Sequence, residues 1–263
     1  MEVHTLQMQL VRAARVLDGV GIEPTADGVL LAGHRHGPVV PWSEIAEILG
    51  SDEPAAPAAR LRLGVLVELR RTVEELGPAA VDAVARAVRP LALPAGHPLH
   101  PGPRWIHHRV PGGVLDVGLG VSRLLPDQDG VLPLPPSVAS AAAVDPAAAW
   151  DRLPRLAERL STFAIDRMEA DAAGPTVLAG VGGCDALTLL TLEPVRARLA
   201  AGSGRPLSPV SAPRRDRVWV GAAAADREYV NAVWLLTPPA RRGVSDPMTV
   251  GAAGVTPAAL QHS

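Results

Sequence analysis

The sequence contains no lysine, and this absence excludes several kinds of chemistry. All 25 basic residues are arginine. Without a lysine amine, the protein cannot form a Schiff base, hold pyridoxal phosphate covalently or supply the lysine of a phosphate-binding P-loop. Alanine, glycine and proline are abundant as well, which is typical of a GC-rich coding sequence. The number of arginines therefore does not by itself indicate a function.

Cysteine and aromatic residues are also scarce. Cys184 is the only cysteine, so no intrachain disulfide can form, and a reducing compartment is expected. Aromatic residues make up 3% of the chain, so alanine, valine and leucine must fill most of the core. The five tryptophans are widely spaced, which argues against a stacking platform for single-stranded nucleic acid.

The chain lacks a large charge excess and a long apolar run. Its net charge is −2, whereas nucleic-acid-binding domains are usually strongly basic. No apolar run approaches the roughly 20 residues that a transmembrane helix needs. The first ten residues, MEVHTLQMQL, lack the basic and apolar regions of a secretory signal. We therefore predict a soluble cytoplasmic protein that binds neither membrane nor nucleic acid.

The residue patterns predict an α+β fold, with an N-terminal β-meander and a mixed sheet flanked by helices. Asp18-Gly19 favours a hairpin turn, and further short strands are expected at 25–33 and 37–42. Ser43 is the expected N-cap of a helix that ends at Leu49. The β-α-β order of the last third leaves an α/β arrangement of the C-terminal half as the alternative.

The middle of the chain combines helical and extended patterns. Residues 60–76 fit both strand alternation and a helical face, and the Gly77 that follows favours the helix. A second helix is expected at 79–89, ended by the segment RPLALPAG. Two strands are predicted within 104–121, joined around Pro111-Gly112-Gly113.

The segment 124–136, LLPDQDGVLPLPP, has the composition of a linker. It predicts a boundary between a domain at 1–123 and a domain at 137–263, with one continuous domain as the alternative. Asp145-Pro146 is the expected start of an amphipathic helix, and Pro154 is expected to divide that helix from the preceding turn.

The strongest candidate site is AGVGGCDALTLL, residues 179–190. Gly182 and Gly183 are predicted to turn from a strand into a helix at 185–200 that Asp185 caps. Cys184 would then lie beside the helix N-terminus, where thiolates and anions are stabilised. The functional interpretation is a phosphate or carboxylate site, or a nucleophilic Cys184. The structural interpretation is a tight turn with a buried thiol, which the absence of a GxGxxG or P-loop motif favours.

Two arginine clusters belong to the same half of the chain. Arg214 and Arg215 lie in PRRDR (213–217), and a second cluster is ARR (240–242). Guanidinium groups bind phosphate and carboxylate through two parallel hydrogen bonds. If the clusters converge on Gly182–Asp185, an anionic small molecule is the expected ligand. The alternative is an ordinary turn and a solvated loop.

The histidines and one aspartate raise further alternatives. His97, His100 and His107 have spacings that could bind a metal such as Zn²⁺, as could His34 with His36. No zinc signature accompanies them, so solvated loop histidines and no metal site are the preferred interpretation. Asp116 is either the polar member of an alternating strand or a catalytic acid.

The stretches WIHHRVPGGVLDVGLG and VGGCDALTLL resemble uncharacterised proteins of high-GC actinobacteria. The resemblance implies a bacterial cytoplasmic protein and no particular activity. Two hypotheses follow. The first is a non-catalytic binding or regulatory protein, with a homo-oligomer as one mode of assembly. The second is a small-molecule enzyme or binder with its pocket at Gly182–Asp185. No intact catalytic motif is present, which favours the first, and the sequence identifies no cofactor.

Overall fold

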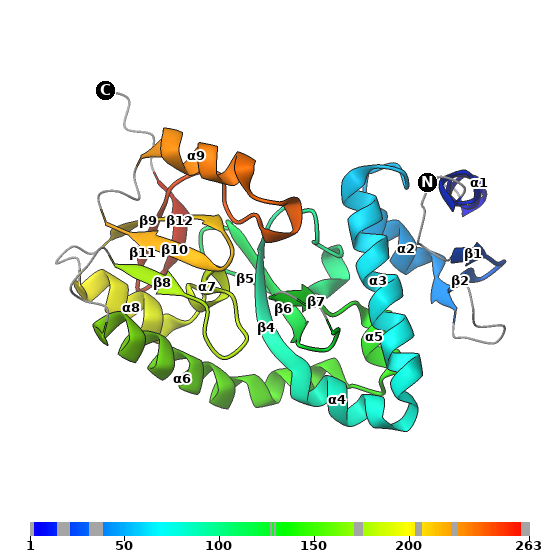
Figure 1. Ribbon diagram of the computed structural model, residues 1–263, viewed down its shortest axis with the longest axis horizontal. Helices are drawn as coiled ribbons and strands as arrows, with labels where there is room; N and C mark the ends of the chain where they lie inside the picture. Colours follow the sequence, from blue (N-terminus) through cyan, green and yellow to red (C-terminus); the bar gives the residue numbers. More distant parts are fainter. Residues whose placement is uncertain are drawn as a thin grey trace.

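The computed structural model describes residues 3–14, 22–31, 39–126, 128, 130–170, 176–202, 207–221 and 226–258. It confirms the α+β class, because helices pack against three sheets whose paired strands run antiparallel. A three-stranded sheet lies at one end of the molecule, a five-stranded sheet at the other and a four-stranded sheet between them (Figure 1). Within the described ranges, no helix has both the length and the apolar composition needed to cross a bilayer.

The N-terminal sheet has the strand order expected of a meander, after an initial helix. The elements are α1 (Val3–Ala14), β1 (Ile22–Pro24), β2 (Gly28–Leu31), β3 (Val40–Pro41) and α2 (Trp42–Leu49). The Asp18-Gly19 turn lies outside the described residues. The prediction that Ser43 caps the next helix is wrong, because the helix begins at Trp42 and the extended residue before it is Pro41. The helix ends at Leu49, as expected.

The central region corrects one strand prediction. Its elements are α3 (Pro57–Leu76), η1 (Gly77–Ala79), α4 (Ala80–Ala87), β4 (Val88–Pro94), η2 (Pro103–Trp105), β5 (Ile106–Arg109), β6 (Leu115–Ser122), β7 (Val131–Pro133) and α5 (Pro136–Ala141). Helix α3 ends before Gly77, as predicted. The RPLALPAG segment does not merely end α4, because most of it belongs to strand β4, which pairs with β6 from Leu115 to Val121. Its two prolines fit because β4 is an edge strand, where a missing N–H leaves no partner unpaired.

The segment expected to be a linker contributes to the fold. Within it, β7 pairs with β6, and Leu134 is buried in the N-terminal core. The C-terminal core is a second cluster, and Trp150 and Leu156 pack against both. The division into two domains stays a prediction.

Helix α6 (Pro146–Ala170) crosses from one core to the other. The Asp145 cap is confirmed, because Asp145 Oδ1 accepts a hydrogen bond from the Ala147 N–H at 3.0 Å. The predicted break at Pro154 is wrong, since α6 continues through this residue. Leu153 is buried in the N-terminal core and Leu160 in the C-terminal core, so packing at both ends favours one continuous helix.

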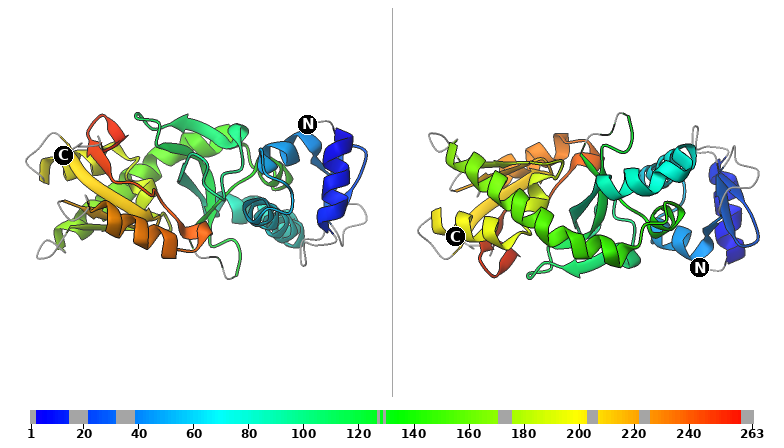
Figure 2. Two further views of the ribbon diagram at one scale, coloured as in Figure 1. Left: turned by 90° about the horizontal axis from the view of Figure 1, so that it is seen from above. Right: turned by 90° about the horizontal axis from the view of Figure 1, so that it is seen from below.

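The C-terminal sheet has the strand order β12-β11-β9-β10-β8. Its elements are β8 (Val177–Ala179), α7 (Ala186–Leu189), α8 (Glu193–Gly202), β9 (Ser208–Arg214), β10 (Arg217–Val220), α9 (Arg227–Leu236), η4 (Pro239–Arg241), β11 (Met248–Gly251) and β12 (Gly254–Pro257). The α/β alternative is wrong for these strands, which pair antiparallel. The helix expected at 185–200 is divided into α7 and α8. Helices α6 and α8 lie on one side of the sheet and α9 on the other (Figures 1 and 2).

Candidate ligand-binding cleft

The Gly182-Gly183 segment is a tight turn. The Cys184 N–H donates to the Val181 carbonyl at 2.9 Å, and both glycines have positive φ, 60° and 80°. Positive φ at both central positions is the signature of a type I′ turn. A Cβ on Gly182 would lie 2.6 Å from Leu160, and one on Gly183 would lie 2.9 Å from the Ser122 hydroxyl. These glycines are therefore required by the backbone and its close packing.

The Asp185 carboxylate binds Arg215 and does not cap a helix. No side-chain hydrogen bond caps α7, and Arg215 Nε lies 2.9 Å from Asp185 Oδ2, to which Nη2 also donates. The same guanidinium donates to the carbonyls of Val131 at 2.6 Å and Ala240 at 3.1 Å. Asp185 is 6% exposed and Arg215 5%. We call this group (Asp185, Arg215 and the two carbonyls) the buried cluster; it joins β7, η4 and the start of α7.

Cys184 lacks the properties of a nucleophile. Its side chain is buried, and desolvation raises the pKa of the thiol to about 12. Of the two interpretations of Cys184, the structure agrees with the preferred one, a buried thiol, because α7 spans only four residues and burial outweighs the positive charge of Arg89. At neutral pH this cysteine is a small buried thiol.

Although the turn is structural, its residues line a cleft of about 460 Å³. The turn forms one wall, the loop after β6 a second, and the start of β10 with α6 a third. The lining residues are Ser122, Arg123, Gln128, Gly130, Arg167, Ala179, Gly180, Val181, Gly182, Gly183, Cys184, Asp185, Asp216 and Arg217. The structure thus places the predicted residues Gly182–Asp185 together at one cavity.

The loop wall of the cleft is organised by one glutamine. Gln128 Oε1 accepts from the N–H groups of Leu124 at 2.9 Å and Leu125 at 3.2 Å. Its Nε2 donates to the carbonyls of Val121 and Gly130. These bonds join Gln128 to the described residues on both sides of it, so that part of the segment expected to be a linker forms a hydrogen-bonded rim.

The charges around the cleft are unevenly paired. Among the described lining residues, the two acidic ones are already neutralised, Asp185 by Arg215 and Asp216 by Arg214, which approaches both carboxylate oxygens at 2.9 and 2.8 Å. Arg123, Arg167 and Arg217 are exposed, and no carboxylate of the described residues forms an ion pair with them. We call these three the open arginines. The described lining therefore has an excess of positive charge.

The predicted arginine pair serves this site indirectly. Arg214 and Arg215 hold the two aspartates, and neither is among the residues that line the cleft. The two arginine clusters do meet through their backbones, since Arg214 forms a β-bridge with Arg242. Of the open arginines, Arg217 belongs to the predicted 213–217 cluster, whereas Arg123 and Arg167 were missed. In a chain without lysine, no sequence signal separates them from other surface arginines.

The interpretation of the histidines as solvated loop residues is wrong for His97, which is buried, while His100 is half-buried. His97 Nδ1 accepts from the Leu99 N–H at 3.0 Å, and its Nε2 lies 2.9 Å from the Arg242 carbonyl. Burial lowers the pKa of His97 to about 3, so the ring is neutral. His100 Nδ1 accepts from the Gly102 N–H at 3.2 Å, and its Nε2 lies 3.2 Å from Asp116 Oδ2. His97 therefore uses both ring nitrogens within the protein, and His100 Nε2 is turned toward the Asp116 carboxylate.

His107 and Asp116 have partners other than a metal ion. His107 stacks on Trp150 at 4.0 Å between ring centroids. His34 and His36 lie outside the described residues, and within those residues no three His, Cys, Asp or Glu side chains gather as metal ligands. Asp116 is not the polar member of an alternating strand, since every residue of β6 is buried. Its carboxylate pairs with Arg109 Nε at 2.9 Å and with His100.

No family model, curated protein or solved structure matches this chain. The actinobacterial resemblance stays a prediction, and the function of the cleft has to be inferred from its own residues.

Proposed function

We propose that this chain is a non-catalytic binding protein whose cleft takes a small anion with phosphate or carboxylate groups. The observation that carries the proposal is the set of open arginines. They come from three separate segments, while Asp185 and Asp216, the acidic residues of the described lining, are paired with other arginines. Guanidinium forks match the oxygens of phosphate and carboxylate, which makes such groups the preferred ligands.

The lining favours binding over catalysis. The Cys184 thiol is protonated at neutral pH, because burial raises its pKa to about 12. No histidine is among the described lining residues, so the nearby Ser122 hydroxyl has no imidazole base there. Within the described lining, the arginines can hold an anion, and neither an activated thiol nor a histidine base lies beside it.

The cleft volume limits the ligand class. About 460 Å³ lies within the range of small-molecule sites and exceeds the space that one phosphate group needs. A ligand with two or more anionic groups would engage arginines from different walls at once. The chain's net charge of −2 makes a long nucleic acid a poor match, since such binding needs an extended basic surface.

The proposed setting is the cytoplasm of a bacterium, which the single reduced cysteine and the actinobacterial resemblance support.

We also propose that the chain forms a homo-oligomer. Helix α9 exposes Tyr229, Leu235 and Leu236, the last at 86%, and such apolar side chains are candidates for a self-contact. Sedimentation analysis of the chain and of Leu236→Glu tests this: a dimer that the substitution dissociates supports the self-contact, and a monomer at all concentrations contradicts it.

The main experiment is calorimetric titration with inorganic pyrophosphate at low salt. We expect binding that weakens as salt is added, because exposed charges are screened. The single substitutions Arg167→Gln and Arg217→Gln should each raise the Kd for pyrophosphate about tenfold, a loss near 1.4 kcal/mol of binding free energy. The triple variant, which combines both with Arg123→Gln, should not bind pyrophosphate. Arg159→Gln is the matched control, since Arg159 is exposed on the same helix as Arg167 and is not among the lining residues.

The proposal fails if neither pyrophosphate nor citrate binds. It also fails if the triple variant binds as well as the original chain, because binding would then lie elsewhere.

A further inference from the structure

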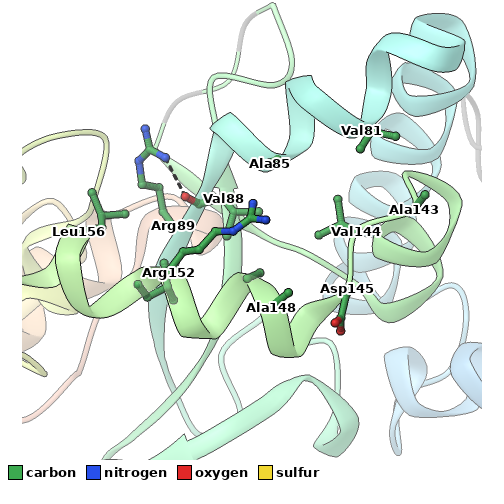
Figure 3. A pocket seen from close by; sticks show the side chains of 12 residues that line it. Val81, Ala85, Val88, Arg89, Ala143, Val144, Asp145, Ala148, Arg152 and Leu156 are labelled. Atoms are coloured by element: carbon green, nitrogen blue, oxygen red, sulfur yellow. Dashed lines mark hydrogen bonds between the residues drawn. The ribbon is translucent and has the colours of Figure 1, made fainter.

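A second hollow lies between α4 and the first half of α6, and we call it the groove (Figure 3). Its volume is about 340 Å³. Its lining residues are Val81, Ala85, Val88, Arg89, Ala143, Val144, Asp145, Ala148, Ala149, Arg152, Leu153 and Leu156. Most of these side chains are apolar, so the groove differs in chemistry from the cleft.

The two helices leave this space open because small side chains face each other across it. On α4, Val84 is fully buried in the core, while Val81 and Ala85, which are four residues apart, line the groove. Val81 is 43% exposed although it is aliphatic. On α6, Ala148 faces the hollow, as Figure 3 shows. An apolar chain placed between the helices would remove these surfaces from water.

Two guanidinium groups lie at the edge of the groove. Arg152 extends across its mouth in Figure 3, and no carboxylate of the described residues forms an ion pair with it. Arg89 Nη1 donates to the carbonyls of Arg86 and Val88 at 2.7 Å, which holds that side chain in place. Among the described lining residues the acidic one is Asp145, whose Oδ1 caps α6. An apolar groove with positive charge at one edge favours a ligand that has an apolar part and an anionic group at one end.

We infer that the groove binds an amphipathic monoanion, a medium-chain aliphatic carboxylate. The alkyl chain would lie between Val81, Ala85 and Ala148, and the carboxylate would bind at Arg152 with Arg89 beside it. The volume of about 340 Å³ is near the lower end of the range for small-molecule sites, which favours a short single chain over a diacyl lipid. The groove and the cleft share no lining residue, although Arg89 Nε donates to the carbonyl of Gly182 in the cleft lining at 3.2 Å.

Titration calorimetry with decanoate, kept below its micellar concentration, tests the inference. Acetate has the charge without the chain, and 1-decanol has the chain without the charge. We expect decanoate to bind at least about tenfold more tightly than either, because apolar burial and the guanidinium contact both contribute. Equal affinity for decanoate and acetate, or for decanoate and decanol, would overturn it.

Variants then place the ligand in the groove. Ala148→Met puts a flexible side chain into the hollow from a half-buried position, and we expect it to weaken decanoate binding about tenfold or more. Arg152→Gln should weaken decanoate about tenfold and leave decanol unchanged. Arg155→Gln is the matched control: this arginine is exposed on the same helix and is not among the lining residues, so binding should stay within twofold.

Circular dichroism and the pyrophosphate titration provide the folding control, since the groove substitutions should leave both unchanged. The inference is overturned if decanoate still binds normally to the Ala148→Met, Arg152→Gln double variant. It is also overturned if the chain forms a dimer that Ala148→Met dissociates, because the groove would then be a contact between two copies.

Discussion

Arg215 and Arg217 are two residues apart, yet they lie in regions with opposite physical character. Arg215 is 5% exposed and donates to Asp185 and to two carbonyls in the buried cluster. Arg217 is exposed at the cleft and has no described carboxylate partner. The comparison shows that a guanidinium surrounded by carbonyl groups stabilises the fold, whereas one that faces a cavity is available to a ligand.

The largest expected effect is at the buried cluster. Arg215→Ala leaves the Asp185 carboxylate buried without its cation and removes the donor to Val131 and Ala240. We expect a loss of about 3–5 kcal/mol in the free energy of unfolding, measured by urea denaturation. Replacing both partners, as Arg215→Leu with Asp185→Leu, should cost less, because no unpaired charge remains. A loss below about 1 kcal/mol for Arg215→Ala would remove the distinction between the two regions.

The thiol beside the cluster should be nearly inert. The rise of its pKa from 9.0 to about 12 lowers the thiolate fraction about a thousandfold, and burial blocks access in addition. Native protein at pH 8 should therefore react with iodoacetamide far more slowly than urea-unfolded protein. Rapid alkylation of the native chain would show instead that Cys184 is open to the cleft.

The burial of His97 predicts that the free energy of unfolding depends on pH. The pKa of His97 falls from 6.5 to about 3 on folding, so the unfolded chain binds the proton more readily between these values. The stabilising contribution of neutral His97 is complete above about pH 6.5 and is lost as pH falls toward 3, a change of a few kcal/mol. Urea denaturation from pH 7 to 4 should give a weaker pH dependence for His97→Gln. His107→Gln, the exposed control, should keep the original slope, and equal slopes for all three proteins would contradict the prediction.

The smallest effect on stability is expected at the open arginines. The Arg123→Gln, Arg167→Gln, Arg217→Gln variant should unfold within about 0.5 kcal/mol of the original chain, because exposed substitutions leave no buried group unpaired. If pyrophosphate raises the Tm of the original chain, as we expect, the same variant should lack that rise in thermal denaturation. A large loss of stability without ligand would mean that these arginines belong to the fold, as Arg215 does.

Local signals predicted much of the fold. Gly77 ends α3, Asp145 caps α6, and the two strands of 104–121 join around Gly112-Gly113. Each of these features depends on a few adjacent residues. The strand at 88–94 was missed because its prolines resemble a helix terminator, and only its edge position beside β6 makes them compatible with a sheet.

The sequence indicated one wall of the candidate cleft, but it did not indicate the roles of the side chains there. Two adjacent glycines correctly indicated a tight turn, and that turn lies at the cleft. The role of Asp185 depends on Arg215, which is 30 residues away in the sequence and donates from another element. The other cleft walls come from the 123–130 loop and from α6, and no local pattern brings these segments together.

Composition and local order alone determined that every cation is an arginine, that the single cysteine cannot form an intrachain disulfide, and where several helices and turns begin and end. These properties need no knowledge of distant residues. Tertiary structure alone decided which arginines are buried, which face the cleft and why Cys184 stays protonated. The physical reason is that desolvation and ion pairing depend on what surrounds a side chain in space, and those neighbours come from segments far apart in the sequence.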